Sequence, residues 1–211
     1  MREIIDKNQL TDLLFANRFS PKNFIEIGSR DGHDTHHIQK YWSLDEKQCY
    51  IIEAHPRCYE DIKRTYPQYN IHNFAASNEY GMVKFNAGII GQEVNVGLSS
   101  VLENTIGPFI FEQVDVRSIR MDSLMELWNI DGFDFMKIDV EGFAFQVLDG
   151  FGDKLKNTKY IQVELEYNTV WKDQVLYGGV LDFLSNKGFK VLHEGFADYP
   201  GKDVLLVNNN I

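Results

Sequence analysis

The sequence predicts a single α/β domain built on a mainly parallel β-sheet with an antiparallel edge. Strand and helix patterns alternate with short connections from residue 23 onward. No Pro-rich or Ser-rich linker divides the 211 residues. The last two strand patterns are joined only by the turn-rich "FADYPGK", which suits an antiparallel hairpin. We therefore expect residues 1–211 to form one domain.

The first part of the chain reads as a helix followed by a βαβαβ unit. Apolar residues at helical spacing predict a leading helix over residues 2–17, within an N-terminal helical extension of residues 1–20. Strands are then expected in "NFIEIG", "CYIIEA" and "NIHNFAA", and helices in "DTHHIQKYW" and "PRCYEDIKRTY". This order implies parallel strands joined by right-handed crossovers.

The middle of the chain has weaker patterns, and the alternation then resumes. "YGMVKFNAG" alternates like a strand, and "NVGLSSVLENTIGP" reads as a loop. Long loops in compact domains are often functional, so we expect residues 88–110 to form a substrate-side loop. Further strands are expected in "FEQVDVRSIRM", "FDFMKIDV", "KYIQVELEY", "GFKVLHEG" and "DVLLVNN". Helices are expected in "DSLMELWNI", capped by Asp122, in "GFAFQVLDG", closed by Gly150, and over residues 174–187.

Charge and composition exclude several function classes. The formal net charge of -10 would repel a phosphate backbone, so nucleic acid and anionic membranes are not expected as partners. No apolar run approaches the roughly 18 residues of a spanning helix, so no membrane insertion is expected. The charged N-terminus is unlike a signal peptide, and we expect a cytoplasmic protein. Cys49 and Cys58 lack zinc-ligand spacing and are interpreted as structural thiols.

A glycine loop, "IEIGSRDGHDT", follows the first predicted strand and opens a helix. The dinucleotide fingerprint requires three glycines, but here only Gly28 fits, because Arg30 and His33 occupy the other two positions. The loop keeps the tight turn and gives up the close approach to a pyrophosphate, which suits a nucleoside cofactor without phosphates. The loop residues predicted to bind this cofactor are Glu26, Gly28, Ser29, Arg30, Asp31 and Gly32.

An acid at the end of the second strand points to a ribose. Glu53 follows Gly28 by 25 positions, where a carboxylate in such a sheet reaches ribose hydroxyls with both oxygens. Ala54, Ala75 and Ala76, at the ends of the second and third strands, offer small walls for an adenine. A glycine or an acid alone marks only a turn. Both in this order favour a ribose and a base without phosphate, which indicates S-adenosylmethionine.

Two acids and a lysine mark the exit of the strand "FDFMKIDV". Alternation puts Lys137, Asp139 and Glu141 on one side of the extended chain, and these three are the predicted catalytic residues. We expect Asp139 to contact the methionine end of the cofactor and Glu141 to lie at the acceptor, where a base accepts a proton. The alternative for Glu141 is an acid at a helix start, favoured there by the helix dipole.

The next strand adds Glu164 and Glu166 on one face, which with Asp139 form an oxygen set suited to Mg²⁺. Against a metal, strand acids are commonly paired with Lys or Arg, and no histidine accompanies these acids. No metal site is therefore predicted, and Mg²⁺ is the less favoured expectation.

Other polar residues have open roles. His33, His36 and His37 follow the glycine loop and are candidate bases, although a surface imidazole is the more frequent outcome. Ser99 and Ser100 are candidates for lining the acceptor side, and simple turn residues are the alternative.

The run "VRSIRMDSLMELWNIDGFDFMKIDVEGFAFQVLDG" resembles the signature of FkbM-family methyltransferases. "FIEIGSRDG", "YIIEAHP", "FAASNEYG" and "GLSSV" occur in the order that this family uses, so the resemblance covers roughly residues 20–207. Residues 137–142 are its specific part, and Ala144 stands where the family usually has a second glutamate. The resemblance implies a Rossmann-like class I methyltransferase fold, with seven mostly parallel strands, the last strand antiparallel, and helices on both faces. It also implies methyl transfer to oxygen, commonly to a hydroxyl of a sugar, a lipid-linked glycan or a polyketide.

The favoured function is an S-adenosylmethionine-dependent O-methyltransferase acting on a small-molecule or glycan acceptor. One alternative is a non-catalytic nucleoside-binding module, which Ala144 supports. A second is a Mg²⁺-dependent hydrolase that uses the acids, but the chain lacks a nucleophile motif. The missing fingerprint disfavours a dehydrogenase. The sequence does not define the acceptor or the oligomeric state.

Overall fold

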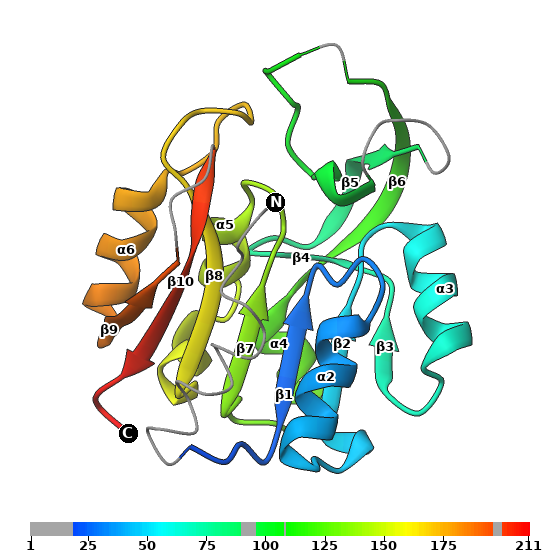
Figure 1. Ribbon diagram of the computed structural model, residues 1–211. Helices are drawn as coiled ribbons and strands as arrows, with labels where there is room; N and C mark the ends of the chain where they lie inside the picture. Colours follow the sequence, from blue (N-terminus) through cyan, green and yellow to red (C-terminus); the bar gives the residue numbers. More distant parts are fainter. Residues whose placement is uncertain (1–18, 90–95, 108, 196–199) are drawn as a thin grey trace.

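The computed structural model describes residues 19–89, 96–107, 109–195 and 200–211 (Figure 1). The predicted leading helix over residues 2–17 therefore lies outside the described residues. The strands of the larger sheet are β1 (Phe24–Ile27), β2 (Cys49–Ile52), β3 (Asn70–His72), β7 (Phe135–Ile138), β8 (Tyr160–Glu166), β9 (Phe189–Glu194) and β10 (Gly201–Asn208). A smaller sheet contains β4 (Ala75–Ser77), β5 (Gly81–Gly88) and β6 (Phe111–Arg120).

The larger sheet has seven strands in the order β3-β2-β1-β7-β8-β10-β9. Strands β3, β2, β1, β7 and β8 pair in parallel. Strand β10, the last in the sequence, is antiparallel to both β8 and β9. This confirms the predicted mostly parallel sheet with an antiparallel last strand, including the hairpin of the two final strands.

Helices cover both faces of the sheet. They are α2 (His33–Trp42), α3 (Pro56–Thr65), α4 (Met121–Trp128), α5 (Ala144–Asp149) and α6 (Tyr177–Asn186), with short 3₁₀ helices η1 (Glu46–Gln48), η2 (Val96–Leu98) and η3 (Gly152–Asn157). On one face, Ile38 of α2 and Ile62 of α3 pack with Phe24 of β1. On the other face, α4, α5 and α6 pack on the opposite side of β1, where Ile25 lies. Both faces of the central strands are thus buried, as is typical of parallel sheets.

The segment "NIHNFAA", predicted as one strand, forms two. Strand β3 pairs with β2 in the larger sheet, whereas β4 pairs with β6 in the smaller one. The chain changes sheets at Asn73, whose side-chain amide donates hydrogen bonds to the carbonyl oxygens of Glu53 (2.8 Å) and Ala54 (3.0 Å). The prediction of one continuous strand was wrong because these contacts hold Asn73 against the exit of β2 and break the ladder.

The start of α4 also differs from the prediction. Arg120, not Asp122, is the N-cap residue, and Asp122 lies in the first turn. The helix begins two residues earlier than a helix capped by Asp122 would, because the side chain of Met121 is completely buried in the core. Asp122 instead pairs with the Arg120 guanidinium at 2.5 Å and accepts a hydrogen bond from the Ser123 N–H at 2.7 Å.

The smaller sheet stands at the carboxyl end of the larger one (Figure 1). Strand β5 pairs with β6 along its whole length, and an isolated bridge between Asn86 and Ser100 ties the segment after η2 to β5. Gly150, at the end of α5, allows a close approach to this sheet, because a Cβ there would lie 2.0 Å from the carbonyl oxygen of Ser77. No helix among the described residues is long and apolar enough to cross a membrane.

Candidate functional site

A cavity of about 320 Å³ opens at the carboxyl ends of the central strands. Strands β1 and β7 are neighbours, and the chain continues from β1 to β2 on one side and from β7 to β8 on the other. Such a switch point is where open α/β sheets bind ligands. The volume lies in the range of small-molecule sites. Residues from the segment after η2 and from β5 complete the lining, so the smaller sheet forms part of the cavity wall.

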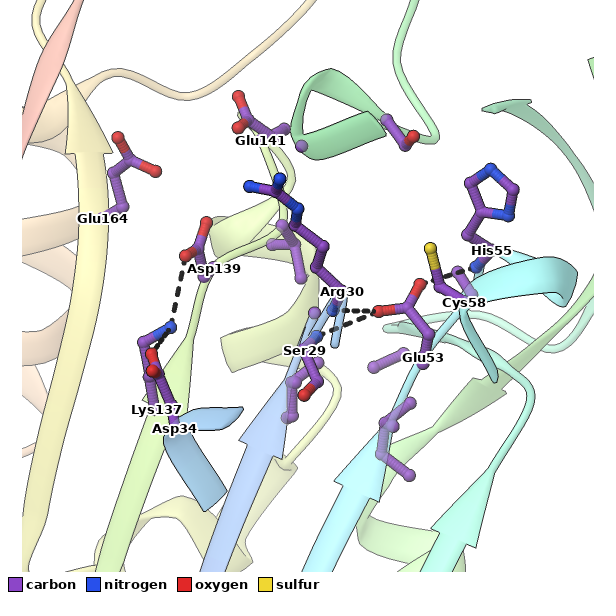
Figure 2. Close-up of a pocket in the computed structure, with 18 of the residues that line it drawn as sticks. Ser29, Arg30, Asp34, Glu53, His55, Cys58, Lys137, Asp139, Glu141 and Glu164 are labelled. Carbon is purple, nitrogen blue, oxygen red and sulfur yellow. Dashed lines mark hydrogen bonds and ion pairs between the residues drawn. The ribbon is translucent and has the colours of Figure 1, made fainter. Parts of the chain in front are cut away.

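The glycine loop lies between β1 and β7. Gly28 has a φ of 80°, and a Cβ at this position would lie 1.8 Å from the carbonyl oxygen of Asp139. Only glycine therefore fits, because the exits of the two strands almost touch here. The next two backbone N–H groups, of Ser29 and Arg30, donate hydrogen bonds to Glu53 Oε2 at 3.0 and 2.7 Å (Figure 2).

Glu53 holds this loop and also lines the cavity. Its second oxygen, Oε1, accepts a hydrogen bond from the His55 N–H at 2.7 Å. Burial raises the pKa of the Glu53 carboxyl, and the backbone donors oppose this shift. Both oxygens, which the sequence assigned to a ribose, are thus already bound by the backbone. A carboxylate has about four acceptor positions, so these three bonds leave capacity for a ligand hydroxyl.

Glu26 organises the loop from below. Its side chain is 1% exposed, and its Oε2 accepts hydrogen bonds from the Ser29 hydroxyl (2.9 Å) and the Thr35 N–H (3.1 Å). Burial raises the pKa of Glu26 to about 7, although Lys137 opposes the shift. The Gly32 N–H donates to the Ser29 hydroxyl at 3.0 Å. Neither Glu26 nor Gly32 is among the residues that line the cavity.

The remaining loop residues predicted to bind the cofactor, Arg30 and Asp31, do line the cavity. Arg30 has a φ of 61°, in the left-handed region that costs a non-glycine residue about 1–3 kcal/mol. Its guanidinium extends into the cavity toward the end where Glu141 lies (Figure 2). Asp31 accepts a hydrogen bond from the His33 N–H at 2.9 Å.

The end of the cavity near β2 is lined by small and apolar residues. Ala54, Ala75 and Ala76 lie there as expected, together with Phe74, Phe85 and Val101. His55 and Cys58 also line this end, and neither residue was predicted from the sequence to lie at the site. Burial raises the pKa of the Cys58 thiol to about 12, so this cysteine is unreactive.

The imidazole of His55 is fixed in one tautomer. Its Nε2 lies 3.1 Å from the carbonyl oxygen of Gly88, which can only accept, so Nε2 carries the proton. Its Nδ1 accepts a hydrogen bond from the Arg57 N–H at 3.3 Å and caps α3. His55 therefore links the exit of β2 to the end of β5.

The opposite end of the cavity is acidic and contains one buried lysine. Lys137 Nζ lies 2.9 Å from Asp34, 3.2 Å from Asp139 and 3.7 Å from Glu26. Burial opposes the charge of Lys137, but the carboxylates of Asp139, Glu26 and Asp34 outweigh it and raise the pKa of Lys137 well above its usual value. Lys137 is therefore charged at neutral pH and cannot accept a proton.

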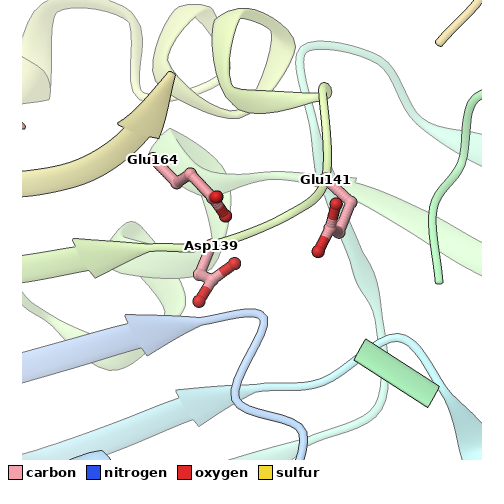
Figure 3. A group of neighbouring side chains, drawn as sticks. All are labelled: Asp139, Glu141 and Glu164. Carbon is pink, nitrogen blue, oxygen red and sulfur yellow. The ribbon is translucent and has the colours of Figure 1, made fainter. Parts of the chain in front are cut away.

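Asp139, Glu141 and Glu164 converge at this end, with one carboxylate oxygen of each residue within 4.8 Å of the others (Figure 3). Glu141 has left the strand: its φ is 50°, and that of Gly142 is 83°. A Cβ on Gly142 would lie 2.3 Å from Trp171 Cδ1, so this turn packs directly on the indole.

Strand β8 supplies only one of its two acids to the cavity. Burial, and then the charges of Asp139 and Glu141, raise the pKa of Glu164 to about 10. Glu166 is 3% exposed and is not among the lining residues. It accepts a hydrogen bond from the backbone N–H of Gly142, and burial raises its pKa to about 7.

Gln162 and Asp203, which were not predicted from the sequence, also line the acidic end. The Gln162 amide nitrogen donates to Asp203 at 3.3 Å. Strand alternation places Gln162 on the same face as Glu164, and the pairing of Glu164 with Asp203 across β8 and β10 places Asp203 there too. That register was the missing signal, since it requires knowing that β10 inserts beside β8.

The candidate histidines and serines separate into two groups. His37 and Ser99 line the cavity, and Ser99 Oγ accepts a hydrogen bond from the Gly88 N–H at 2.8 Å. His33 is exposed, and His36 stacks on Tyr66 at the C-terminal end of α3. Neither histidine lines the cavity. Ser100 also does not line it, but its hydroxyl donates to the carbonyl oxygen of Glu141 at 2.6 Å and anchors the turn.

The fold is shared with solved methyltransferase structures. The FkbM methyltransferase from Methylobacillus flagellatus KT superimposes with a TM-score of 0.57 and 10% identity, over 89% of this chain and 44% of that chain. The O-methyltransferase from Bacillus cereus in complex with S-adenosylhomocysteine superimposes with a TM-score of 0.52 and 14% identity, over 98% of this chain and 81% of that chain. The N-terminal domain of EvdMO1, crystallised with S-adenosylhomocysteine and D-fucose, superimposes with a TM-score of 0.50 and 11% identity, over 98% of this chain and 84% of that chain. At these identities the similarities establish the fold alone.

The sequence comparison establishes the family. No curated protein sequence matches this chain significantly. The sequence model of the methyltransferase FkbM domain, however, matches residues 26–191, which include the glycine loop, Glu53 and the acids after β7. Because this match spans most of its length, the chain belongs to the methyltransferase FkbM domain family.

Proposed function

We propose that this methyltransferase uses S-adenosylmethionine to methylate a hydroxyl oxygen of a sugar, glycan or other small molecule. The observation that carries the proposal is the cavity at the switch point, which has an apolar end beside Glu53 and an acidic end beside Asp139. These two ends match the two ends of the cofactor, a nucleoside and an amino acid.

The apolar end holds the nucleoside. The adenine lies among Ala54, Ala75 and Ala76, and the ribose hydroxyls bind the acceptor positions of Glu53 that its backbone donors leave open. Glu26 and Gly32 contribute indirectly, because they hold the glycine loop in shape. The Bacillus cereus enzyme and the EvdMO1 domain were both crystallised with S-adenosylhomocysteine, which supports a cofactor of this kind.

The methionine end extends from the glycine loop toward Asp139. Asp139 contacts its ammonium group, and the Arg30 guanidinium, which extends into the cavity, is the available counter-charge for its carboxylate. Gly28, Ser29 and Asp31 line the path between the two ends. Lys137 keeps Asp139 in place through their ion pair of 3.2 Å.

When bound, S-adenosylmethionine supplies an electrophilic methyl group on a sulfonium. The residues of the acidic end orient the acceptor hydroxyl in line with the carbon–sulfur bond, and positioning of this kind supplies about 7–11 kcal/mol. A carboxylate at this end would take the hydroxyl proton as the methyl group moves to the hydroxyl oxygen and the neutral thioether leaves with the electron pair of the broken carbon–sulfur bond. Glu141 is that base, since Lys137 is already charged and the raised pKa of Glu164, about 10, keeps it protonated at neutral pH.

The acidic end also favours a hydroxyl-bearing acceptor. Carboxylates accept hydrogen bonds from hydroxyl groups, whereas a phosphate or carboxylate on the acceptor would meet the like charge of Glu141. The EvdMO1 domain was crystallised with D-fucose, and this supports a sugar as the acceptor class.

Calorimetric titration with S-adenosylmethionine and S-adenosylhomocysteine tests the cofactor assignment. We expect micromolar binding to the wild-type chain and loss of binding in Glu53→Ala. Glu103→Gln, whose side chain is 72% exposed and is not among the cavity-lining residues, is the matched control and should bind normally. Absence of binding in the folded wild-type protein would overturn the proposal.

A screen of acceptors, beginning with sugars and glycans, tests the reaction. Transfer of a labelled methyl group to an acceptor hydroxyl supports an O-methyltransferase and excludes a non-catalytic module. Transfer only to nitrogen or carbon would contradict the assignment to oxygen.

A further inference from the structure

The convergence of Asp139, Glu141 and Glu164 brings together oxygens from three separate segments. Asp139 follows β7, Glu141 belongs to the turn before α5, and Glu164 lies on β8 (Figure 3). One oxygen of each lies within 4.8 Å of the others, and all three side chains are partly exposed to the cavity. Oxygens on opposite sides of one Ca²⁺ are about 4.6–5.2 Å apart, and those around Mg²⁺ about 4.0–4.2 Å. The three carboxylates are therefore spaced to share one ion.

A buried amide beside these acids gives a second, independent indication. Gln162, on β8, is 2% exposed and lines the same cavity. Its nitrogen donates to Asp203, but its side-chain carbonyl oxygen has no hydrogen-bond partner among the described residues. A buried polar atom without a partner costs about 1–3 kcal/mol, so native proteins rarely keep one without a ligand or a water. An amide carbonyl is also a usual ligand of hard cations.

Acidic side chains outnumber basic ones at this end of the cavity, where Lys137 and Arg30 are the Lys and Arg residues of the lining. Asp139, Glu141, Glu164 and Asp203 all line it, and Glu164 has no ion pair within the described parts of the chain. Lys137 is already shared by three carboxylates, of which Asp139 alone belongs to the acidic set, and Arg30 extends toward Glu141 (Figure 2). A bound cation would remove the repulsion that these carboxylates exert on one another.

From this geometry we propose that Asp139, Glu141 and Glu164 bind a hard divalent cation of the Mg²⁺, Mn²⁺ or Ca²⁺ class at the acidic end of the cavity. All available donors are oxygens, which disfavours zinc and other metals that prefer nitrogen or sulfur. The set differs from the one considered from sequence, because the turn residue Glu141 takes the place of Glu166. Coordination positions that face the cavity are filled by water or by acceptor oxygens.

Binding of acceptor oxygens to the cation rests on the proposed function, and it restricts the chemical class of the acceptor. A cation beside the methyl-transfer point binds two neighbouring oxygens of one molecule better than a single hydroxyl. The acceptor class that suits the site is a vicinal diol, as found in sugars, and the cation stabilises the oxygen as it loses its proton.

Manganese binding to the full chain tests the site without any activity assay. The EPR signal of free Mn²⁺ is lost on binding, so titration of EDTA-treated, metal-free protein gives stoichiometry and affinity. We expect one Mn²⁺ per chain, displaced by Mg²⁺ or Ca²⁺. Glu164→Gln and Asp139→Asn, which keep side-chain shape, should each weaken binding by at least about tenfold. Glu112→Gln, an acid with a side chain 54% exposed and outside the cavity lining, should bind Mn²⁺ as the wild type does.

Two results would overturn the proposal: no Mn²⁺ bound by the folded wild-type chain, or unchanged affinity in both Glu164→Gln and Asp139→Asn. Circular dichroism of each variant verifies its fold. Titration of the metal-free protein with S-adenosylmethionine separates the two proposals. Cofactor binding without Mn²⁺ binding refutes the cation site and retains the proposed methyltransferase function. Mn²⁺ binding without cofactor binding gives the reverse conclusion.

Discussion

Replacement of Lys137 by methionine should destabilise the protein because it leaves a deeply buried acid without its cation. Nζ of Lys137 lies between Glu26, Asp34 and Asp139. Asp34 and Asp139 have side chains 22% and 39% exposed, so water partly screens them after the change. Glu26 is 1% exposed, and its Oε1 has no hydrogen-bond partner among the described residues. The unpaired charge of Glu26 should therefore account for most of the loss in the free energy of unfolding.

Removal of one partner from a buried ion pair costs about 3–5 kcal/mol. Because two of the three acids are partly exposed, we expect the lower end of this range, about 3 kcal/mol at pH 8. In a chain of 211 residues, 1 kcal/mol shifts Tm by about 2–4 °C, so Lys137→Met should lower Tm by about 6–12 °C.

The cost depends on pH in a predictable direction. The pKa of Glu26 is already raised from 4.5 to about 7 by burial, even with Lys137 opposing the shift, and the loss of Lys137 raises it further. An acid whose pKa is raised by folding binds more protons in the folded state than in the unfolded state. Stability is therefore lost as pH rises from about 4.5 through the folded pKa. Lys137→Met should thus be less destabilised at pH 6, where Glu26 is largely protonated, than at pH 8.

Thermal unfolding followed by circular dichroism at pH 6 and pH 8, without ligands, measures both effects. The double variant Lys137→Met with Glu26→Gln should recover most of the lost stability at pH 8, since the uncompensated charge is gone. Lys84→Met, which breaks an exposed pair with Asp115, is the control and should change stability by about 0–1 kcal/mol. The reasoning is refuted if the double variant is as unstable as Lys137→Met, or if Lys137→Met loses equal stability at both pH values.

Three further variants probe the acidic end. Gly142→Ala forces a Cβ to 2.3 Å from Trp171, so it should displace the Glu141 turn and reduce kcat while the Kd of S-adenosylmethionine stays nearly constant; normal kcat would contradict this. Glu141→Gln should depress turnover by about 10²- to 10⁴-fold and keep cofactor affinity, measured by methyl transfer and calorimetry, and unchanged turnover would exclude Glu141 as the base. Glu164→Gln should raise Tm in metal-free buffer more at pH 8 than at pH 5. The reason is that folding raises the pKa of Glu164 from 4.5 to about 10, so the ionisable side chain destabilises the folded protein increasingly as the pH rises above 4.5. Equal shifts of Tm at both pH values would argue against this account.

The sequence predicted the positions of those cavity features that local chemistry sets. The tight turn after β1 requires glycine at residue 28 for its positive φ, and the acid at the end of β2 follows from the βαβ order. Both signals lie within one supersecondary unit, so no knowledge of distant contacts was needed. The roles that these residues share with the backbone were not predictable in the same way. That Glu53 binds three N–H groups of its own chain depends on the finished loop.

The elements that were predicted wrongly depend on distant contacts. The break between β3 and β4 follows from the bonds of Asn73 to the end of β2, and a strand pattern such as "NIHNFAA" does not reveal them. Asp122 is a favourable N-cap residue by local preference. Burial of Met121 in the core outweighs that preference and starts α4 two residues early.

The acidic cluster shows why alternation alone cannot assemble a site. Glu164 and Glu166 share a face of β8, but two residues of a strand advance the chain by about 6.6–6.8 Å. That advance exceeds the 4.8 Å within which the converging oxygens lie, so a straight strand does not bring both acids to one point beside Asp139. A third oxygen has to come from a segment that leaves the sheet. The Glu141–Gly142 turn does this through its two positive φ angles, and Glu166 serves it indirectly by accepting the Gly142 N–H.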